Sequence, residues 1–234
     1  MTTQQPTRYY KAVRPDGTDF YSGKVNYLAG DTIKHPSPGD VGSSGAFGYL
    51  SISVSPTDCT GFTWPARLLE VEPIGESWTP HAGDLPNKRA AHEIRVLREL
   101  PAYELLGPQG AEFAALLERF TTLTADDCDK LAAARAAARS DAWGAARDAA
   151  RDAAWGAARP AAWDAAWDAV LPAARAVARA AARPDAWDAA WAVVREVAWA
   201  LFARDLLDTE QYDLLTGPWR RSIGPIHPDD ADLS

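Results

Sequence analysis

Three sets of polar residues in the first third of the chain could do chemistry together. An arginine, a Ser-x-Ser pair and a Glu-x-Glu pair follow one another, at Arg8 or Arg14, at Ser51 and Ser53, and at Glu70 and Glu72. The segments that contain them are expected to be separate strands. The serines and glutamates alternate with Ile, Leu and Val, so the structural alternative is that they form the polar face of half-buried strands.

The order of these residues resembles that of the ADP-ribosyltransferases. The resemblance implies that the arginine holds the cofactor phosphate and that the serine strand shapes the nicotinamide pocket. It also implies that Glu72 activates the acceptor and stabilises developing positive charge. The interval between Ser53 and Glu70 is shorter than in that family. An ADP-ribosyltransferase-like enzyme built on the N-terminal module is therefore one of two hypotheses for the function.

The other residues that commonly carry chemistry form no recognisable site. The four histidines, His35, His81, His92 and His227, are not spaced like metal ligands, and no phosphate-binding glycine loop or nucleophile elbow occurs. Cys59 and Cys128 lie far apart and are expected to be reduced thiols. We expect neither a metal nor a cofactor.

A four-residue repeat dominates the C-terminal half. From Arg135 to Trp199 every fourth residue is Arg or Trp, with Leu171 as the one exception. The residues between them are mostly Ala, which favours helix strongly. A four-residue step turns an α-helix by about 400°, so the Arg/Trp stripe drifts by roughly 40° per repeat. A long straight helix could not keep this stripe on one face.

Prolines divide the repeat at regular intervals. Pro160, Pro172 and Pro184 are each twelve residues apart. Proline disrupts a helix interior but is accepted in the first turn. We therefore expect short helices or sharply kinked segments, each with one Trp/Arg face and one Ala face. Along such a helix Trp143 and Arg147, four residues apart, can stack as a cation–π pair, and Asp148 can pair with Arg151 across one turn. Whether the prolines kink helices or end them stays open.

The Trp/Arg faces have two possible roles. They could pack internally, or they could bind a protein partner or a second copy of the chain, because Trp and Arg are enriched at binding hot spots. The candidate partner-binding residues are Trp143, Trp155, Trp163, Trp167, Trp187, Trp191, Arg147 and Arg159. Stacking of single-stranded nucleic acid on these rings is opposed by the neighbouring Asp residues. The leading hypothesis is a non-enzymatic interaction or assembly protein.

Three segments carry a second resemblance. They are the opening YKAVRPDGTDFYSG (Tyr10–Gly23), the pair LSISVSP and RLLEVEPIG, and the ending ARDLLDTEQYDLLTGPWRR (Ala203–Arg221). Together they resemble uncharacterised bacterial and phage proteins that join a small N-terminal α/β module to an Asp-Ala-Ala-Trp or Asp-Ala-Ala-Arg tract. The resemblance implies a division into two domains and brings no catalytic residues with it.

The predicted fold class is α+β. A small, mostly antiparallel β module should occupy residues 1–101, with strands near 8–13, 19–21, 48–54, 66–72 and 93–97 and a long loop at 30–48. A connecting helix is expected in 102–123, with its apolar face in 112–120. The helical repeat with a C-terminal cap should follow in 124–222, and Thr124 followed by Ala125, Asp126 and Asp127 is typical of a capping box at its start. Gly217-Pro218-Trp219 should end the order, and 223–234 should be a disordered acidic tail.

Charge and hydropathy limit the possible partners. The net charge is −8, and the repeat is only mildly basic, which disfavours nucleic acid. The N-terminus has no apolar signal-peptide core. The most apolar run, 186–207, contains five charged residues, so no membrane span is expected. We expect a cytoplasmic protein.

Overall fold

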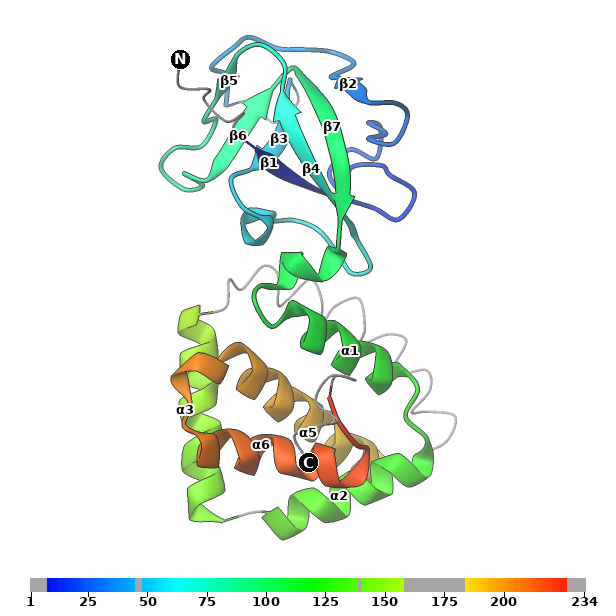
Figure 1. Cartoon of the computed structure of the whole chain (residues 1–234), viewed down its shortest axis with the longest axis vertical. Coiled ribbons are helices and arrows are strands. Elements are labelled where there is room, and N and C mark those ends of the chain that lie inside the picture. The colour runs from blue at the N-terminus through cyan, green and yellow to red at the C-terminus, as the bar shows by residue number, and fades with distance from the viewer. Residues whose placement is uncertain (1–7, 45–47, 139, 158–183, 227–234) are drawn as a thin grey trace, which may run out of the picture. The chain divides into compact units, whose positions relative to one another are not determined.

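The structure, a computed structural model, describes residues 8–44, 48–138, 140–157 and 184–226. A sheet occupies the N-terminal half, and the helices lie mostly in the C-terminal half (Figure 1), which confirms the α+β class. Contacts divide the chain into two compact units with their boundary between Gly107 and Pro108. The segment expected to connect two domains thus contributes its helix to the second unit.

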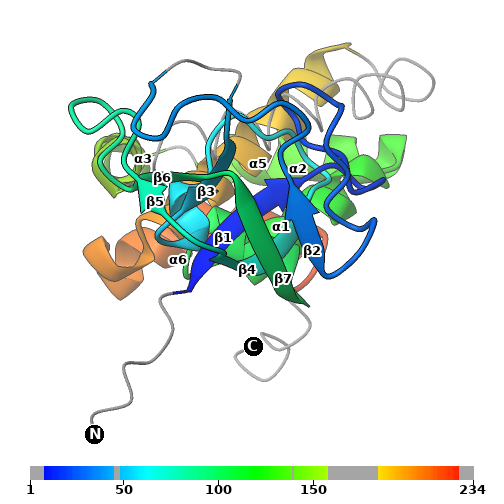
Figure 2. The same ribbon diagram turned by 90° about the horizontal axis from the view of Figure 1, so that it is seen from above.

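All the strands form one antiparallel sheet. The strands are β1 (Tyr9–Val13), β2 (Thr32–Lys34), β3 (Leu50–Ser53), β4 (Arg67–Pro73), β5 (Ser77–Trp78), β6 (Lys88–Ala91) and β7 (Glu93–Leu100). Their order across the sheet is β2-β7-β4-β1-β3-β6-β5, which Figure 2 shows from above. The two ends of the sheet are its shortest strands, which leaves little unpaired backbone for edge-to-edge association.

One face of the sheet carries the core of the first unit. Strands β3 and β4 alternate apolar and polar residues, and their apolar positions join aromatic and aliphatic residues from β1 and the following loop. The cluster comprises Tyr9, Val13, Val25, Tyr27, Ile33, Leu50, Ile52, Leu69, Val71, Ala91 and Ile94. Burial of this surface is the main term that holds the sheet together.

The main strands agree with the sequence, and two local expectations were wrong. The strands expected near 8–13, 48–54, 66–72 and 93–97 are confirmed. Residues 19–21 do not form a strand, because the Asp19 carboxylate accepts hydrogen bonds from Ser22 N (2.5 Å) and Val25 N (3.2 Å) and closes a loop. Residues 88–91, which lie outside the expected strands, form β6. The loop expected at 30–48 contains the short strand β2.

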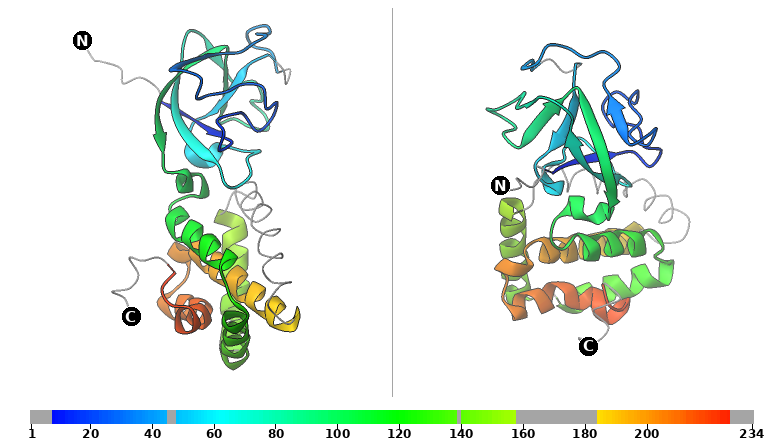
Figure 3. Two further views of the ribbon diagram at one scale, coloured as in Figure 1. Left: turned by 90° about the vertical axis from the view of Figure 1, so that its right-hand side faces the viewer. Right: turned by 45° about the horizontal axis from the view of Figure 1, so that its top comes forward.

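The second unit is all helical. Its described helices are α1 (Gly110–Thr121), α2 (Ala125–Ala138), α3 (Asp141–Ala157), α5 (Pro184–Phe202) and α6 (Thr209–Ser222). A short 3₁₀ turn at Arg204–Leu206 lies between α5 and α6, and the first unit contains two more, at Pro56–Asp58 and Ala102–Leu106. Helix α5 contacts all four of the other described helices, as the two views of Figure 3 show. Because it is covered on most sides, α5 buries Ala and Val residues around most of its circumference.

Two helices begin with reciprocal caps. Before α2, the Thr124 hydroxyl accepts from Asp127 N, and the Asp127 carboxylate accepts from Thr124 N. Before α6, Asp208 and Gln211 make the same exchange. The capping box expected at Thr124 is therefore confirmed, and each box satisfies backbone donors that the first helical turn leaves free.

The expected proline restarts stay a prediction, because residues 158–183 lie outside the described ranges. Pro184 is the first residue of α5, where its missing N–H costs no hydrogen bond, whereas Pro160 and Pro172 lie outside the described residues. Gly144 lies inside α3 and does not interrupt it. No helix among the described ranges is long and apolar enough to cross a membrane.

The end of the chain is more ordered than expected. We expected order to end at Gly217-Pro218-Trp219, and this was wrong: α6 continues to Ser222 and Trp219 is fully buried. Ile226, in the segment expected to be a disordered tail, is also buried. A large buried indole anchors the helix more strongly than the Gly-Pro pair weakens it.

Candidate functional site

A cavity of about 910 Å³ lies within the first unit. Residues of β1, β3 and β6 line it together with the loops that follow β1 and β2. Its walls are rich in aromatic side chains, which are Tyr10, Phe20, Tyr21, Tyr27 and Tyr49. Its polar groups include three lysines and two histidines, which are Lys11, Lys24, Lys88, His35 and His81. A cavity of this size and composition is typical of small-molecule sites.

Strand pairing places two of the polar groups next to each other. Tyr10 of β1 pairs with Ser53 of β3, and Ser53 pairs with Lys88 of β6. Neighbouring strands are about 4.8 Å apart, so these three residues form a row across the sheet. Lys88 Nζ donates to Ser53 Oγ at 3.0 Å, and Ser53 Oγ donates to the carbonyl of Asp58 at 3.2 Å. The serine thus fixes the position of the ammonium group.

Burial weakens the proton affinity of both inner lysines. Burial lowers the pKa of Lys88; Cys59 opposes this effect and the nearby charge of Lys11 adds to it, and together they bring the pKa to about 8. Burial also lowers the pKa of Lys11, although Asp19 partly opposes it. Lys11 Nζ lies 5.1 Å from the centre of the Tyr27 ring, a cation–π distance. The cavity therefore holds two cations that are poorly compensated.

Asp19 is the one acidic residue of the described part of the chain that lines the cavity, and its carboxylate is occupied by hydrogen bonds within its own loop. Asp19 accepts from the backbone and hydroxyl of Ser22 and from Val25 N, at 2.5, 2.7 and 3.2 Å. Burial alone would raise the pKa of Asp19, but these hydrogen bonds outweigh it and lower the pKa. Within the described ranges neither Lys11 nor Lys88 makes an ion pair.

Two further groups could exchange protons or react. Tyr49 Oη and His81 Nε2 are 3.1 Å apart at the cavity wall, and burial raises the pKa of Tyr49. Cys59 is also buried there, and burial raises the pKa of its thiol despite the opposing charge of Lys88. A thiol with a raised pKa stays protonated at neutral pH and is a poor nucleophile.

The residues of the ADP-ribosyltransferase hypothesis are only partly brought together. Ser51 and Ser53 line the cavity, whereas neither the arginines nor the glutamates do. Both carboxylate oxygens of Glu70 are engaged, one with Arg8 at 3.0 Å and the other with Arg98 at 2.6 Å.

The remaining two residues of that hypothesis have partners of their own. Glu72 pairs with Arg95 at 2.7 Å, and the Arg14 guanidinium lies 5.8 Å from the centre of the Phe20 ring. The cavity therefore does not bring an arginine, a serine and a free glutamate together.

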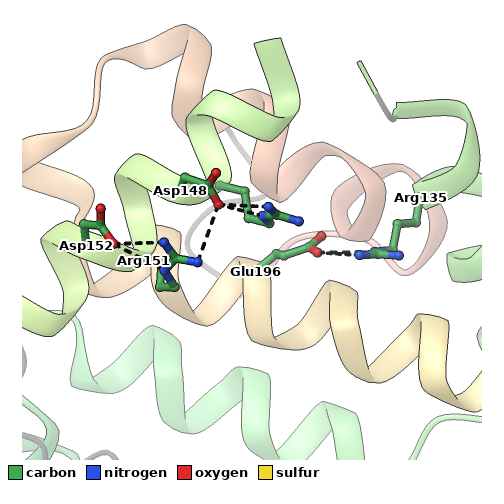
Figure 4. A network of polar contacts seen from close by, with 6 residues as sticks. Arg135, Asp148, Arg151, Asp152 and Glu196 are labelled. Carbon is green, nitrogen blue, oxygen red and sulfur yellow. Dashed lines mark hydrogen bonds and ion pairs between the residues drawn. The ribbon is translucent and has the colours of Figure 1, made fainter. Parts of the chain in front are cut away.

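Trp143 and Arg147, two of the candidate partner-binding residues, pack inside the helical unit. The Trp143 ring is buried, and the guanidiniums of Arg135 and Arg147 lie 5.3 and 5.4 Å from its centre. The stacking expected between Trp143 and Arg147 is thus confirmed. Arg147 also bonds to Asp148 at 2.9 Å, and Asp148 lies 3.6 Å from Arg151, as expected from their spacing (Figure 4).

Trp187 and Trp191 also pack within the unit. Both tryptophans lie on α5, and the ring of Phe120 on α1 contacts each of them. The ring centroid of Phe120 is 5.1 Å from that of Trp187 and 5.3 Å from that of Trp191. The side chains of Trp155, Arg159, Trp163 and Trp167 lie outside the described residues. The rings of the described candidates Trp143, Trp187 and Trp191 therefore all contact other side chains of the helical unit.

Sequence reasoning missed the lysines of the cavity. The signal was present, because Lys11 interrupts an apolar, aromatic strand and the chain has only five lysines. A lysine on such a strand is equally expected to reach solvent along its stem. Only the fold shows that Tyr27 and the loop after β1 cover it.

Comparisons with known proteins add no assignment. No protein-family model, no curated protein and no solved structure matches the chain. In the ranges that the structure describes, no group of three or more His, Cys, Asp or Glu side chains could hold a metal ion. The chemistry of the cavity is therefore the main guide to function.

Proposed function

We propose that the N-terminal unit binds a small ligand that has an oxyanion, such as a phosphate, sulfate or carboxylate, attached to an apolar or aromatic body. One observation carries the proposal: Lys11 and Lys88 line one cavity, and within the described residues neither makes an ion pair. Asp19, the one lining carboxylate, is held by hydrogen bonds of its own and acts only on Lys11, at longer range. Both lysines are half-buried, and desolvation of a cation without an ion-pair partner is costly.

An oxyanion would remove this cost. It would supply the missing negative charge to both lysines, and charge-assisted hydrogen bonds to a buried anion contribute about 1.5–3 kcal/mol each. Ser51 and His35 line the same cavity and add further hydrogen-bonding groups. These side chains suit a compact ligand group whose oxygens can accept several hydrogen bonds, as an oxyanion does.

The rest of the cavity suits an apolar body. Tyr10, Phe20 and Tyr49 provide ring surfaces against which a planar group can pack. Leu50, Pro36 and Pro80 complete this lining. The ligand class that fits both parts is an aromatic or heteroaromatic oxyanion of low molecular weight.

Calorimetry with phenyl phosphate tests the proposal, with phenol as the probe that lacks the oxyanion. We expect phenyl phosphate to bind and phenol to bind at least tenfold more weakly. Lys88→Met and Lys11→Met should each weaken phenyl phosphate binding by tenfold or more. Lys34→Met is the matched control, because Lys34 lies on β2, is exposed and pairs with Glu93.

Three results bear against the proposal. Equal affinity for phenol and phenyl phosphate would remove the role of the oxyanion. Equal loss of affinity in Lys34→Met would indicate a general charge effect. Absence of binding for phenyl phosphate, orthophosphate and benzoate alike would refute an oxyanion site.

For the helical unit we keep the proposal made from the sequence, that it binds a protein partner or a second copy of the chain. The support is the continuation of the Trp/Arg repeat over Trp163 and Trp167, beyond the internally packed Trp143, Trp187 and Trp191. Light scattering of the chain and of the Trp163→Ala/Trp167→Ala double variant tests it. A concentration-dependent oligomer that the double variant abolishes supports the proposal, and a monomer in both cases contradicts self-association.

A further inference from the structure

The geometry of the cavity points to a covalent step: we propose that Lys88 forms a reversible imine with a carbonyl group of the bound ligand. The ligand class narrows accordingly, to an aldehyde or ketone that also carries an oxyanion. This inference rests on the proposed function, because the oxyanion holds the carbonyl near the amine.

The position of Lys88 is the first support. Its side chain lines the cavity, and Nζ is held at 3.0 Å from Ser53 Oγ rather than by a carboxylate. An ion pair would keep the amine protonated and unreactive, whereas a hydroxyl allows it to exist in either form. Lys11 stands in the same cavity and could hold the oxyanion while Lys88 reacts.

The protonation state of Lys88 is the second support. With a pKa of about 8, roughly a tenth of the side chains are neutral at pH 7, compared with less than a thousandth for an ordinary lysine. Burial and a neighbouring cation are the two factors that convert lysines into nucleophiles in enzymes that form imines. Both act on Lys88.

The step balances without an oxidant or a reductant. The lone pair of neutral Nζ adds to the carbonyl carbon, and the C=O π electrons move to oxygen. Two protons pass from nitrogen to that oxygen, the C–O bond breaks, and water leaves as the C=N bond forms. The products are one imine and one water. The Tyr49–His81 pair lines the same cavity and contains an exchangeable proton for these transfers.

Three related probes test the inference on the full chain. Pyridoxal 5′-phosphate carries an aldehyde and a phosphate on one aromatic ring, pyridoxine 5′-phosphate lacks the aldehyde, and pyridoxal lacks the phosphate. Each is incubated with the protein and sodium cyanoborohydride, and adducts are mapped by peptide mass spectrometry. We expect one major adduct with pyridoxal 5′-phosphate, on Lys88, formed at least tenfold faster than on any other lysine and faster than with pyridoxal.

Matched variants separate this site from general lysine labelling. Lys88→Arg keeps the charge, so it should keep binding of pyridoxine 5′-phosphate and lose the adduct. Lys34→Arg is the control, since Lys34 is exposed, pairs with Glu93 and does not line the cavity, and it should leave the Lys88 adduct unchanged. Far-ultraviolet circular dichroism confirms that each variant is folded, and adduct mapping on the wild-type chain tests the inference independently of the variants.

The outcomes distinguish the two proposals. Binding of pyridoxine 5′-phosphate without a Lys88 adduct refutes the imine alone. Absence of both binding and adduct refutes the imine and the oxyanion site together. Labelling spread over the exposed lysines at rates equal to that of Lys88 also overturns the inference. At a saturating concentration of pyridoxal 5′-phosphate, the labelling rate should rise with pH as Lys88 loses its proton.

Discussion

Lys88 and Ser53 lie directly opposite each other on β6 and β3, and the lysine ammonium donates to the serine hydroxyl at 3.0 Å. Lys88 is half-buried, and a hydroxyl is a weak partner for such a cation, because it has no charge to offset desolvation. The pair therefore leaves Lys88 able to lose its proton or to accept an anion. The predictions on ligand binding and on alkaline stability follow from this relationship.

Binding of phenyl phosphate should weaken as the pH rises through about 8. The pKa of Lys88 in the free protein is about 8, and its charge is needed to attract the oxyanion. Above that pH the dissociation constant should increase by up to tenfold per pH unit, until the pKa of the complex is reached. Calorimetry from pH 6 to 10 measures this, and a flat profile would show that Lys88 does not contact the ligand.

Stability should rise in the alkaline range because of the same residue. The folded-state pKa of Lys88 is about 8, below the ordinary value of 10.5, so the unfolded chain binds more protons between these values. The free energy of unfolding should therefore increase between about pH 8 and 10.5. Lys88→Met should be more stable than the wild type at pH 7, by about 1–3 kcal/mol. Urea unfolding at several pH values compares it with Lys34→Met, which should retain the alkaline rise.

Removal of Arg135 should destabilise the helical unit strongly. Arg135 Nη2 lies 2.9 Å from Oε1 of Glu196, which is 1% exposed, and Oε2 has no partner in the described part of the chain (Figure 4). Arg135→Met would leave a buried, unpaired carboxylate at a cost of roughly 3–5 kcal/mol. The double variant Arg135→Met/Glu196→Leu should recover most of the loss. Urea unfolding measures both, and an equal loss in the double variant would contradict this explanation.

Glu196 should also make stability decrease as the pH rises above about 4.5. Burial raises the pKa of Glu196 above its ordinary value of 4.5, although Arg135 opposes the rise. Its favourable contribution is complete below the unfolded-state pKa and is lost as the pH rises through the folded-state pKa. Glu196→Gln should lack this loss. Thermal unfolding between pH 4 and 7 tests it, and parallel curves for the two proteins would exclude Glu196 as the cause.

Phe120 should be the most sensitive single position of α1. Its ring lies against both Trp187 and Trp191, and it is 1% exposed. Phe120→Ala should lower the free energy of unfolding by about 3–5 kcal/mol and shift the tryptophan emission to longer wavelength. Leu206→Ala, at a residue 65% exposed, should change stability by less than about 0.5 kcal/mol. Similar effects of the two substitutions would show that the stacked rings contribute little.

Much of the fold could be predicted from local sequence. Alternation in Tyr49–Val54 and Ala66–Glu72 predicted β3 and β4, and Thr124 with Asp127 predicted the start of α2. The spacing of Trp143, Arg147 and Asp148 predicted contacts along one helix. These features depend on interactions within a few residues, which a sequence displays directly.

The segments that were predicted wrongly depend on which side chains are buried. Residues 19–21 are β-prone, but the buried Asp19 carboxylate accepts hydrogen bonds from Ser22 N and Val25 N and draws the backbone into a loop. Gly217-Pro218 disfavours helix, yet the burial of Trp219 maintains α6. In each case a buried side chain outweighs a backbone preference of about 1–3 kcal/mol.

The sequence by itself determined the class of the protein: an antiparallel β module, an Ala-rich helical unit and an Arg/Trp spacing that allows stacking along a helix. Only the tertiary structure decided which charges are buried. Strand order placed Lys88 beside Ser53 and near Lys11, although 77 positions separate the two lysines along the chain. Desolvation depends on what covers a side chain from every direction, and that property exists only once the chain is folded.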